Sequence, residues 1–135
     1  MTGYRNHTFD EIAVGTADTA SRTLSASEVE AVSMVAGEVE PDHVTAARAG
    51  RGDALTAPGA SAIAMVSGML LRRLPGPGAV ITGTRMSYAG RVAAGDTLTA
   101  TVTATAKREQ DHEIEFDCRC VNQRDEVLVR GTATV

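Results

Sequence analysis

Two side chains that could act together as an acid and a base lie in the segment GEVEPDHV, residues 37–44. Glu38 and His43 are five residues apart, and Pro41 lies between them. Within a continuous helix this spacing separates two side chains, whereas a chain that leaves a helix at Gly37 and turns at Pro41 can bring them to one cavity. A carboxylate and an imidazole that face one water can exchange protons with it near neutral pH. The pair therefore suits addition of water to an activated double bond, or its removal.

Two other interpretations of this segment stay open. Acidic residues and a histidine beside a proline are common in exposed, solvated loops. A metal site could also be built from Glu38, Glu40, Asp42 and His43, although these residues include one imidazole and no second ligand cluster accompanies them. We expect neither a metal nor another cofactor.

A second feature is the segment APGAS, residues 57–61, at the start of an apolar run. If a buried helix begins at Gly59, its free N–H and the helix dipole could hold the oxygen of a thioester carbonyl as negative charge develops there. Most glycines at helix starts only make turns, and that alternative stays open. Ser61 and Ser67 fall on the same helix, where we expect each hydroxyl to bond back to its own backbone.

Two helices are predicted to position these groups. Ser27 and Glu30 have the spacing of a capping box, valines recur at helical spacing, and Gly37 is a plausible stop, so a helix of about ten residues ends just before the acid–base pair. The second helix, over residues 58–73, opens at Pro58 and is apolar on nearly every side, which predicts burial all round. Residues 44–57 between them are predicted to form a loop.

After residue 78 the pattern changes to a period of two. Apolar and polar residues alternate over 79–90, 96–108, 112–122 and 126–135, and a less distinct strand is predicted over 16–25. Turn-forming residues at 93–96, 108–111 and 122–125 separate the strands. In the second of these strands, the alternation from Leu98 to Ala106 predicts one inward face.

The two cysteines, Cys118 and Cys120, lie two apart in one predicted strand, so they share a face with Ile114 and Phe116. We interpret them as reduced core residues rather than as a redox pair or half of a metal site.

These elements predict an α+β protein in which residues 1–135 form one domain and an antiparallel sheet wraps around one long helix. Open edges of such a sheet usually pair with a second copy, so we expect a homodimer.

Composition excludes several classes of protein. Apolar residues make up 43% of the chain, and it has two Phe, two Tyr and no Trp, so stacking on bases or sugars is not expected. The net charge of −4 comes from interspersed charges without a basic stripe, which argues against nucleic-acid binding. No apolar run reaches the roughly 20 residues that span a bilayer, and we expect a cytoplasmic protein.

Taken in order, these segments resemble the MaoC-like branch of the hot-dog fold, which includes (R)-specific enoyl-CoA hydratases and 3-hydroxyacyl-thioester dehydratases. The resemblance covers nearly the whole chain and rests on FDEIAVG at 9–15, GEVEPDH at 37–43, APGA at 57–60, LPGPG at 74–78 and MSYAGRVAAGDTLTATVTAT at 86–105. It implies a hot-dog fold and a coenzyme A or acyl-carrier thioester as the substrate.

The resemblance also assigns roles. The family's segment typically reads Gly-Asp-x-Asn-Pro-x-His, whose aspartate and histidine are catalytic, and these roles fall on Glu38 and His43. The glycine of the family's Ala-His-Gly-Met segment, whose amide binds the thioester oxygen, corresponds to Gly59. The family's active-site serine corresponds to Ser67.

The chain departs from the family pattern at several of these positions. Glu38 has one methylene more than the family's aspartate, and Glu40 replaces an asparagine beside it. Pro58 replaces the histidine before the glycine. We expect Glu40 and Pro58 to contribute to substrate binding, and Arg48 and Arg51 to meet substrate phosphates, although these arginines could equally be solvated.

Three hypotheses follow. The first is a hydratase or dehydratase acting on an acyl thioester, with Glu38 and His43 as acid and base, Gly59 as oxyanion donor and Ser67 as an orienting hydroxyl. The second is a hot-dog enzyme recruited to another lyase, isomerase or cyclisation reaction on a polar substrate. The third is a non-catalytic hot-dog subunit.

Overall fold

The computed structural model describes residues 4–36, 56–57 and 59–135. The elements along the chain are β1 (Ala17–Thr23), α1 (Ala26–Ala36), β2 (Thr56–Ala57), α3 (Ala60–Arg72), β3 (Gly83–Tyr88), β4 (Val92–Ala93), β5 (Thr97–Arg108), β6 (Glu113–Val121) and β7 (Val127–Thr134). Within the described ranges, none of the helices has the length and apolar character needed to cross a membrane.

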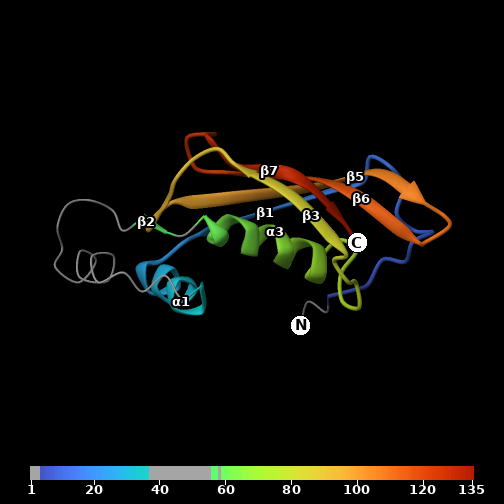
Figure 1. Cartoon of the computed structure of the whole chain (residues 1–135), viewed down its shortest axis with the longest axis horizontal. Helices are drawn as coiled ribbons and strands as arrows, with labels where there is room; N and C mark the ends of the chain where they lie inside the picture. Colours follow the sequence, from blue (N-terminus) through green and yellow to red (C-terminus); the bar gives the residue numbers. More distant parts are fainter. Residues whose placement is uncertain (1–3, 37–55, 58) are drawn as a thin grey trace.

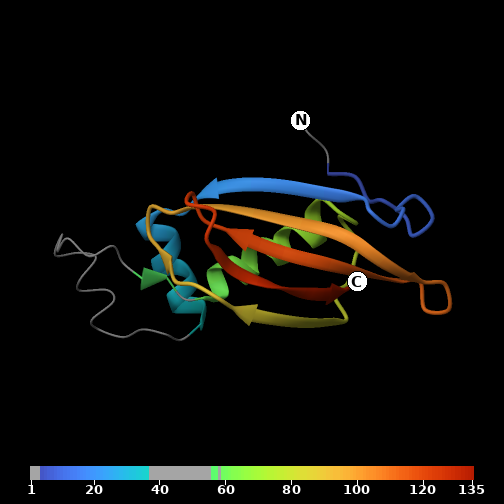
Figure 2. The ribbon, with the colours of Figure 1, turned by 90° about the horizontal axis from the view of Figure 1, so that it is seen from above.

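Five strands form one antiparallel sheet in the order β1-β5-β6-β7-β3. Figure 2 shows β1 and β3 at opposite edges of this sheet, with α3 running across one face between them. The short strands β2 and β4 pair separately near α1, at the end of the molecule where α3 begins (Figure 1). The predicted antiparallel sheet around a long helix is confirmed.

Alternation along the strands creates the inner face of the sheet. Buried and exposed residues alternate along β6, and its buried side chains are Ile114, Phe116, Cys118 and Cys120, as predicted. Along β5, buried and half-buried residues alternate from Leu98 to Ala104. The prediction is wrong for Ala106, which is exposed, because a register shift between Ala104 and Ala106 moves the rest of β5 out of phase.

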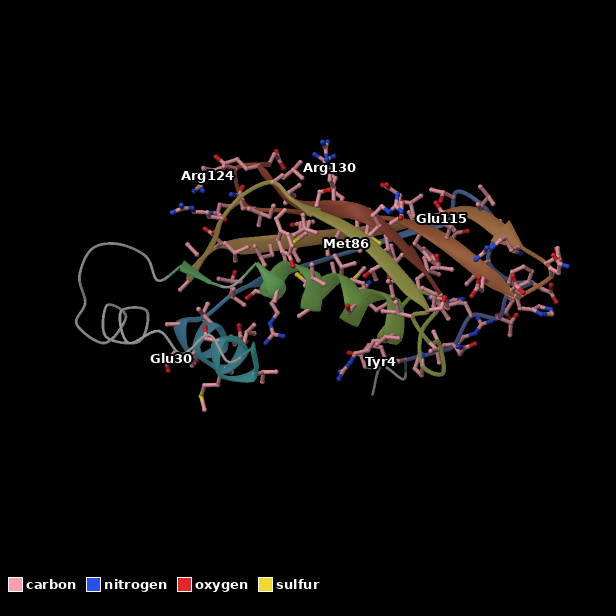
Figure 3. The ribbon with its side chains drawn as sticks, viewed as in Figure 1. Tyr4, Glu30, Met86, Glu115, Arg124 and Arg130 are labelled. Atoms are coloured by element: carbon pink, nitrogen blue, oxygen red, sulfur yellow. The ribbon has the colours of Figure 1, made fainter. Side chains whose placement is uncertain are left out.

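Helix α3 packs against this inner face through one side only. Ala62, Val66, Met69 and Leu70 are buried, whereas Leu71 is 39% exposed. Burial all round is therefore wrong for the single chain, since the sheet covers one side of the helix. The outer face of the sheet is polar, and Arg130 on β7 points away from α3 (Figure 3).

The capping box of α1 lies two residues before the predicted one. The backbone N–H of Glu28 donates to Ser25 Oγ at 3.2 Å, and the backbone N–H of Ser25 donates to Glu28 Oε2 at 3.0 Å. Because α1 already begins at Ala26, Ser25 rather than Ser27 stands before its first turn. The predicted stop at Gly37 and most of the predicted loop, residues 44–55, lie outside the described residues, and the prediction is wrong for residues 56–57, which form β2.

Two glycines offer a matched pair for testing this packing. A Cβ at Gly131 on β7 would lie 2.0 Å from the carbonyl oxygen of Arg85 and 2.8 Å from Met86 Cα, both backbone atoms of β3. At Gly68 on α3 such a Cβ would meet no described atom within 4 Å apart from its chain neighbours and the backbone of the helix itself. The first position needs glycine for close approach of the strands, and the second does not.

We expect Gly131→Ala to lower the free energy of unfolding by about 3 kcal/mol or more, because backbone must move. Gly68→Ala should raise it by about 0.5–1 kcal/mol, because alanine loses less entropy in a helix. Urea unfolding followed by circular dichroism measures both changes. A tolerated Gly131→Ala variant would contradict the pairing of β7 with β3.

The buried cysteines provide a second test. Both are free thiols, and burial raises the pKa of Cys118 to about 12 and that of Cys120 to about 11, from an ordinary value of 9.0. We expect neither thiol to react with a disulfide reagent at pH 8 in the folded protein, and both to react in urea. Since the unfolded chain releases these protons near pH 9, stability should fall as the pH rises from about 9 toward 11. Fast labelling of the native protein would contradict their burial.

Candidate active site

Two of the predicted site residues, Gly59 and Ser67, are described by the structure. The other six, namely Glu38, Glu40, His43, Arg48, Arg51 and Pro58, lie outside the described residues. Five of these six belong to residues 37–55, which connect α1 to β2, and Pro58 stands between β2 and α3 in the sequence (Figure 1).

Gly59 stands at the N-terminus of α3, as predicted. Its carbonyl accepts a hydrogen bond from the backbone N–H of Ala62 at 3.2 Å, and within the described part of the chain no side chain caps the helix. The first N–H groups of an α-helix have no partner within it, and the helix dipole makes this end partly positive. The start of α3 can therefore stabilise negative charge on an oxygen placed there.

Tyr88, the last residue of β3, packs directly against Gly59. A Cβ at Gly59 would lie 2.6 Å from Tyr88 Cε1 and 2.7 Å from Cδ1, so the ring occupies the space that any other side chain would need. Sequence reasoning missed this contact. The alternation of the strand shows that Tyr88 is a strand residue, but not that the end of β3 lies against the start of α3.

Ser67 is half-buried and lies eight residues beyond Gly59 on α3. Eight residues correspond to about 12 Å along a helix and to about 80° of net rotation around it. The structure therefore places Ser67 about two turns from the helix start, on a neighbouring side of the helix.

A cavity of about 620 Å³ lies between α1, α3 and β1. Its walls are largely apolar and include Val32 of α1, Met65 and Gly68 of α3 and Leu98 of β5. Ser61 also borders it, and among the described residues the buried hydroxyl of Ser61 has no hydrogen-bond partner. The expectation that this hydroxyl bonds back to the helix backbone is therefore wrong.

Two ion pairs lie at this cavity, whereas Arg72, which also borders it, is in none of the ion pairs of the described residues. Arg73 donates from Nε and Nη2 to the two carboxylate oxygens of Asp18, at 2.8 and 3.0 Å. Arg22 pairs with Glu28, and the backbone N–H of Ser25, followed by Arg22, lowers the pKa of Glu28. Both carboxylates are thus held by partners, so neither is a free acid or base. Elsewhere in the described ranges, no three side chains of metal-binding type come together.

Comparison with known proteins finds relatives that match nearly the whole chain. The chain is 30% identical over 131 residues to an (R)-specific enoyl-CoA hydratase of Rhodospirillum rubrum, which covers 96% of this chain and 90% of that protein. It is 28% identical over 130 residues to a 3-hydroxybutyryl-CoA dehydratase of Methylorubrum extorquens, covering 94% and 82% of the two chains. No family model matches the chain.

The fold has close counterparts among solved structures. An (R)-hydratase from Aeromonas caviae involved in PHA biosynthesis superposes with a TM-score of 0.82 at 29% identity, over 91% of this chain and 95% of that one. The sheet wrapped around α3 is thus the hot-dog fold, and it defines the class of protein. The chain belongs to the MaoC-like (R)-specific enoyl-CoA hydratase family.

The contact between Gly59 and Tyr88 leads to a prediction. Gly59→Ala should lower the free energy of unfolding by about 1–2 kcal/mol, because the new methyl group overlaps the ring. In a Tyr88→Ala background the same substitution should cost about 1 kcal/mol less, a coupling that a double-mutant cycle in urea measures. Additive effects would show that the ring does not limit the residue at position 59.

Proposed function

We propose that this protein adds water across the α,β double bond of an acyl thioester, or removes it. The observation that carries this proposal is the 30% identity to an (R)-specific enoyl-CoA hydratase over 96% of the chain. The 28% identity to a 3-hydroxybutyryl-CoA dehydratase supports the same chemistry in the reverse direction. Hydration and dehydration share one transition state, so one site performs both.

In this proposal the start of α3 stabilises the charge that develops on the substrate. When water attacks the β-carbon of an enoyl thioester, electrons move onto the thioester oxygen and form an enolate. The N–H of Gly59, supported by the helix dipole, donates to that oxygen. Gly59 is partly exposed, which supports this role because a glycine presents only backbone atoms to a ligand. Ser67 is proposed to orient the substrate from the same helix.

Glu38 and His43 are proposed to act together on one water. One member of the pair removes a proton from the water as its oxygen bonds to the β-carbon, and the other delivers a proton to the α-carbon. Supporting this role is the position of residues 37–43 directly after α1, which borders the cavity beside α3.

The departures from the family pattern are proposed to set the substrate. The longer arm of Glu38 and the added charge of Glu40 suit a different acyl group from that of an ordinary enoyl-CoA. Pro58 would shape the entrance beside Gly59, and Arg48 and Arg51 would meet the phosphates of coenzyme A or of a carrier protein.

We also propose that residues 1–135 form one domain, that the protein works in the cytoplasm, and that it is a homodimer. For the dimer, the support is the edge strand β3, which pairs only with β7 within the described residues, together with two exposed apolar side chains, Tyr88 at the end of β3 and Leu71 on α3. Light scattering during size-exclusion chromatography tests this, and a stable monomer would contradict it.

Incubation with crotonyl groups on coenzyme A and on acyl carrier protein tests the reaction itself. Hydration of the crotonyl group removes the absorbance of the conjugated enoyl thioester. Dehydration of 3-hydroxybutyryl thioesters should produce that absorbance. No change with any enoyl or hydroxyacyl thioester would favour the other lyase reactions or the non-catalytic subunit.

The shared role of the catalytic pair gives a further prediction. Glu38→Gln and His43→Ala should each lower kcat at least about 100-fold, and the double variant should be little slower than either one, because groups that act as a unit are non-additive. Steady-state kinetics on the substrate found above measures this. Losses that multiply would argue for independent roles.

A further inference from the structure

Ser61 carries the one buried side-chain polar atom that lacks a hydrogen-bond partner among the described residues. The residue is only 5% exposed and lies in the first turn of α3, two positions after Gly59. Buried hydroxyl groups without a partner are rare, because burial removes the hydrogen bonds that water would supply. Such a hydroxyl indicates a group that is satisfied when a ligand is bound.

Ser61 is one of the residues that border the cavity between α1, α3 and β1. The walls of this cavity are largely apolar, and Val32 on α1 and Met65 on the next turn of α3 are among them. A plain hydrocarbon chain in this cavity would match the walls but leave the Ser61 hydroxyl unpaired. A chain with one well-placed polar group would satisfy both.

We infer that Ser61 is a specificity-determining residue, which hydrogen-bonds a hydroxyl or carbonyl group on the acyl part of the thioester. The inference rests on the proposed function and names its substrate class: enoyl and 3-hydroxyacyl thioesters whose chain carries an additional neutral polar group.

The position of the cavity fits an acyl chain. It lies between α1, which precedes residues 37–43, and α3, which follows Gly59. The reaction is proposed to occur at residues 38 and 43 and at Gly59. Ser61 and Gly68 both border it, and seven residues of α-helix span about 10 Å, which suits a chain of medium length.

The charges around the cavity indicate that the polar group is neutral. Arg73 is paired with Asp18, and Arg22 with Glu28, so these ions already neutralise one another. A carboxylate on the substrate would have to compete with Asp18 or Glu28 for these two arginines, and Arg72, which also borders the cavity, lies eleven residues beyond Ser61, about 16 Å along the helix. A hydroxyl or carbonyl group needs only the Ser61 hydroxyl, which can donate or accept.

The test compares trans-2-hexenoyl thioesters with their 4-, 5- and 6-hydroxy derivatives, each on coenzyme A and on acyl carrier protein. We expect at least one hydroxy derivative to be hydrated with a kcat/KM about 10-fold above that of the parent. In Ser61→Ala this preference should disappear, a change of about 1.4 kcal/mol at 25 °C. The thermal stability of Ser61→Ala should not fall, because no hydrogen bond within the described structure is lost.

Two further variants separate specificity from structure. Ser33→Ala removes another serine that is 5% exposed, on α1 and not bordering the cavity, and should keep the hydroxyl preference. Gly68→Leu projects a side chain into the cavity and should lower the ratio of kcat/KM for the hydroxyhexenoyl thioester to that for crotonyl thioester.

The outcomes distinguish the two proposals. A wild-type protein that hydrates trans-2-hexenoyl thioesters without preferring any hydroxy derivative would overturn this inference alone, as would an unchanged preference in Ser61→Ala. A protein that hydrates none of the thioesters would overturn the proposed function, and this inference with it.

Discussion

Close packing of α3 against the sheet is the constraint on which the rest of the structure depends. The inner face of the sheet carries small, fully buried side chains, among them Ala100, Ala104, Cys118 and Cys120, which let the helix approach the strands. This approach brings the start of α3 against the end of β3. On its other side it leaves room between α3, α1 and β1 for a cavity.

Much of this architecture could be predicted from the sequence, because the strongest patterns are long. Strand β6 alternates over its 9 residues and strand β5 as far as Ala104, and the run that became α3 is apolar and is followed by prolines and glycines. The errors lie where local rules compete. Ser25 and Ser27 both precede a glutamate by three residues, and only the start of the helix decides between them. The register shift after Ala104 has no signal in a run of alternating alanines and threonines.

The site could be predicted only in part, for a different reason. Gly59 was identified because helix starts have local signals, whereas its contact with Tyr88 joins residues on separate elements. Whether the Ser61 hydroxyl has a hydrogen-bond partner depends on how α3 packs against other elements, which periodicity does not reveal. The pairing of Glu38 with His43 came from their chemistry and from family resemblance, and it stays a prediction because both lie outside the described residues.

Helix α3 is fastened at both ends. At its start Gly59 packs against the Tyr88 ring on β3. Just beyond its end, Arg73 donates two hydrogen bonds to Asp18 on β1. A helix held at both edges of the sheet cannot shift along its axis or rotate about it without breaking one of these contacts. Evolution toward new substrates would therefore proceed by substitution of individual side chains on the exposed side of α3. The fold and the start of α3 at Gly59 would stay in place.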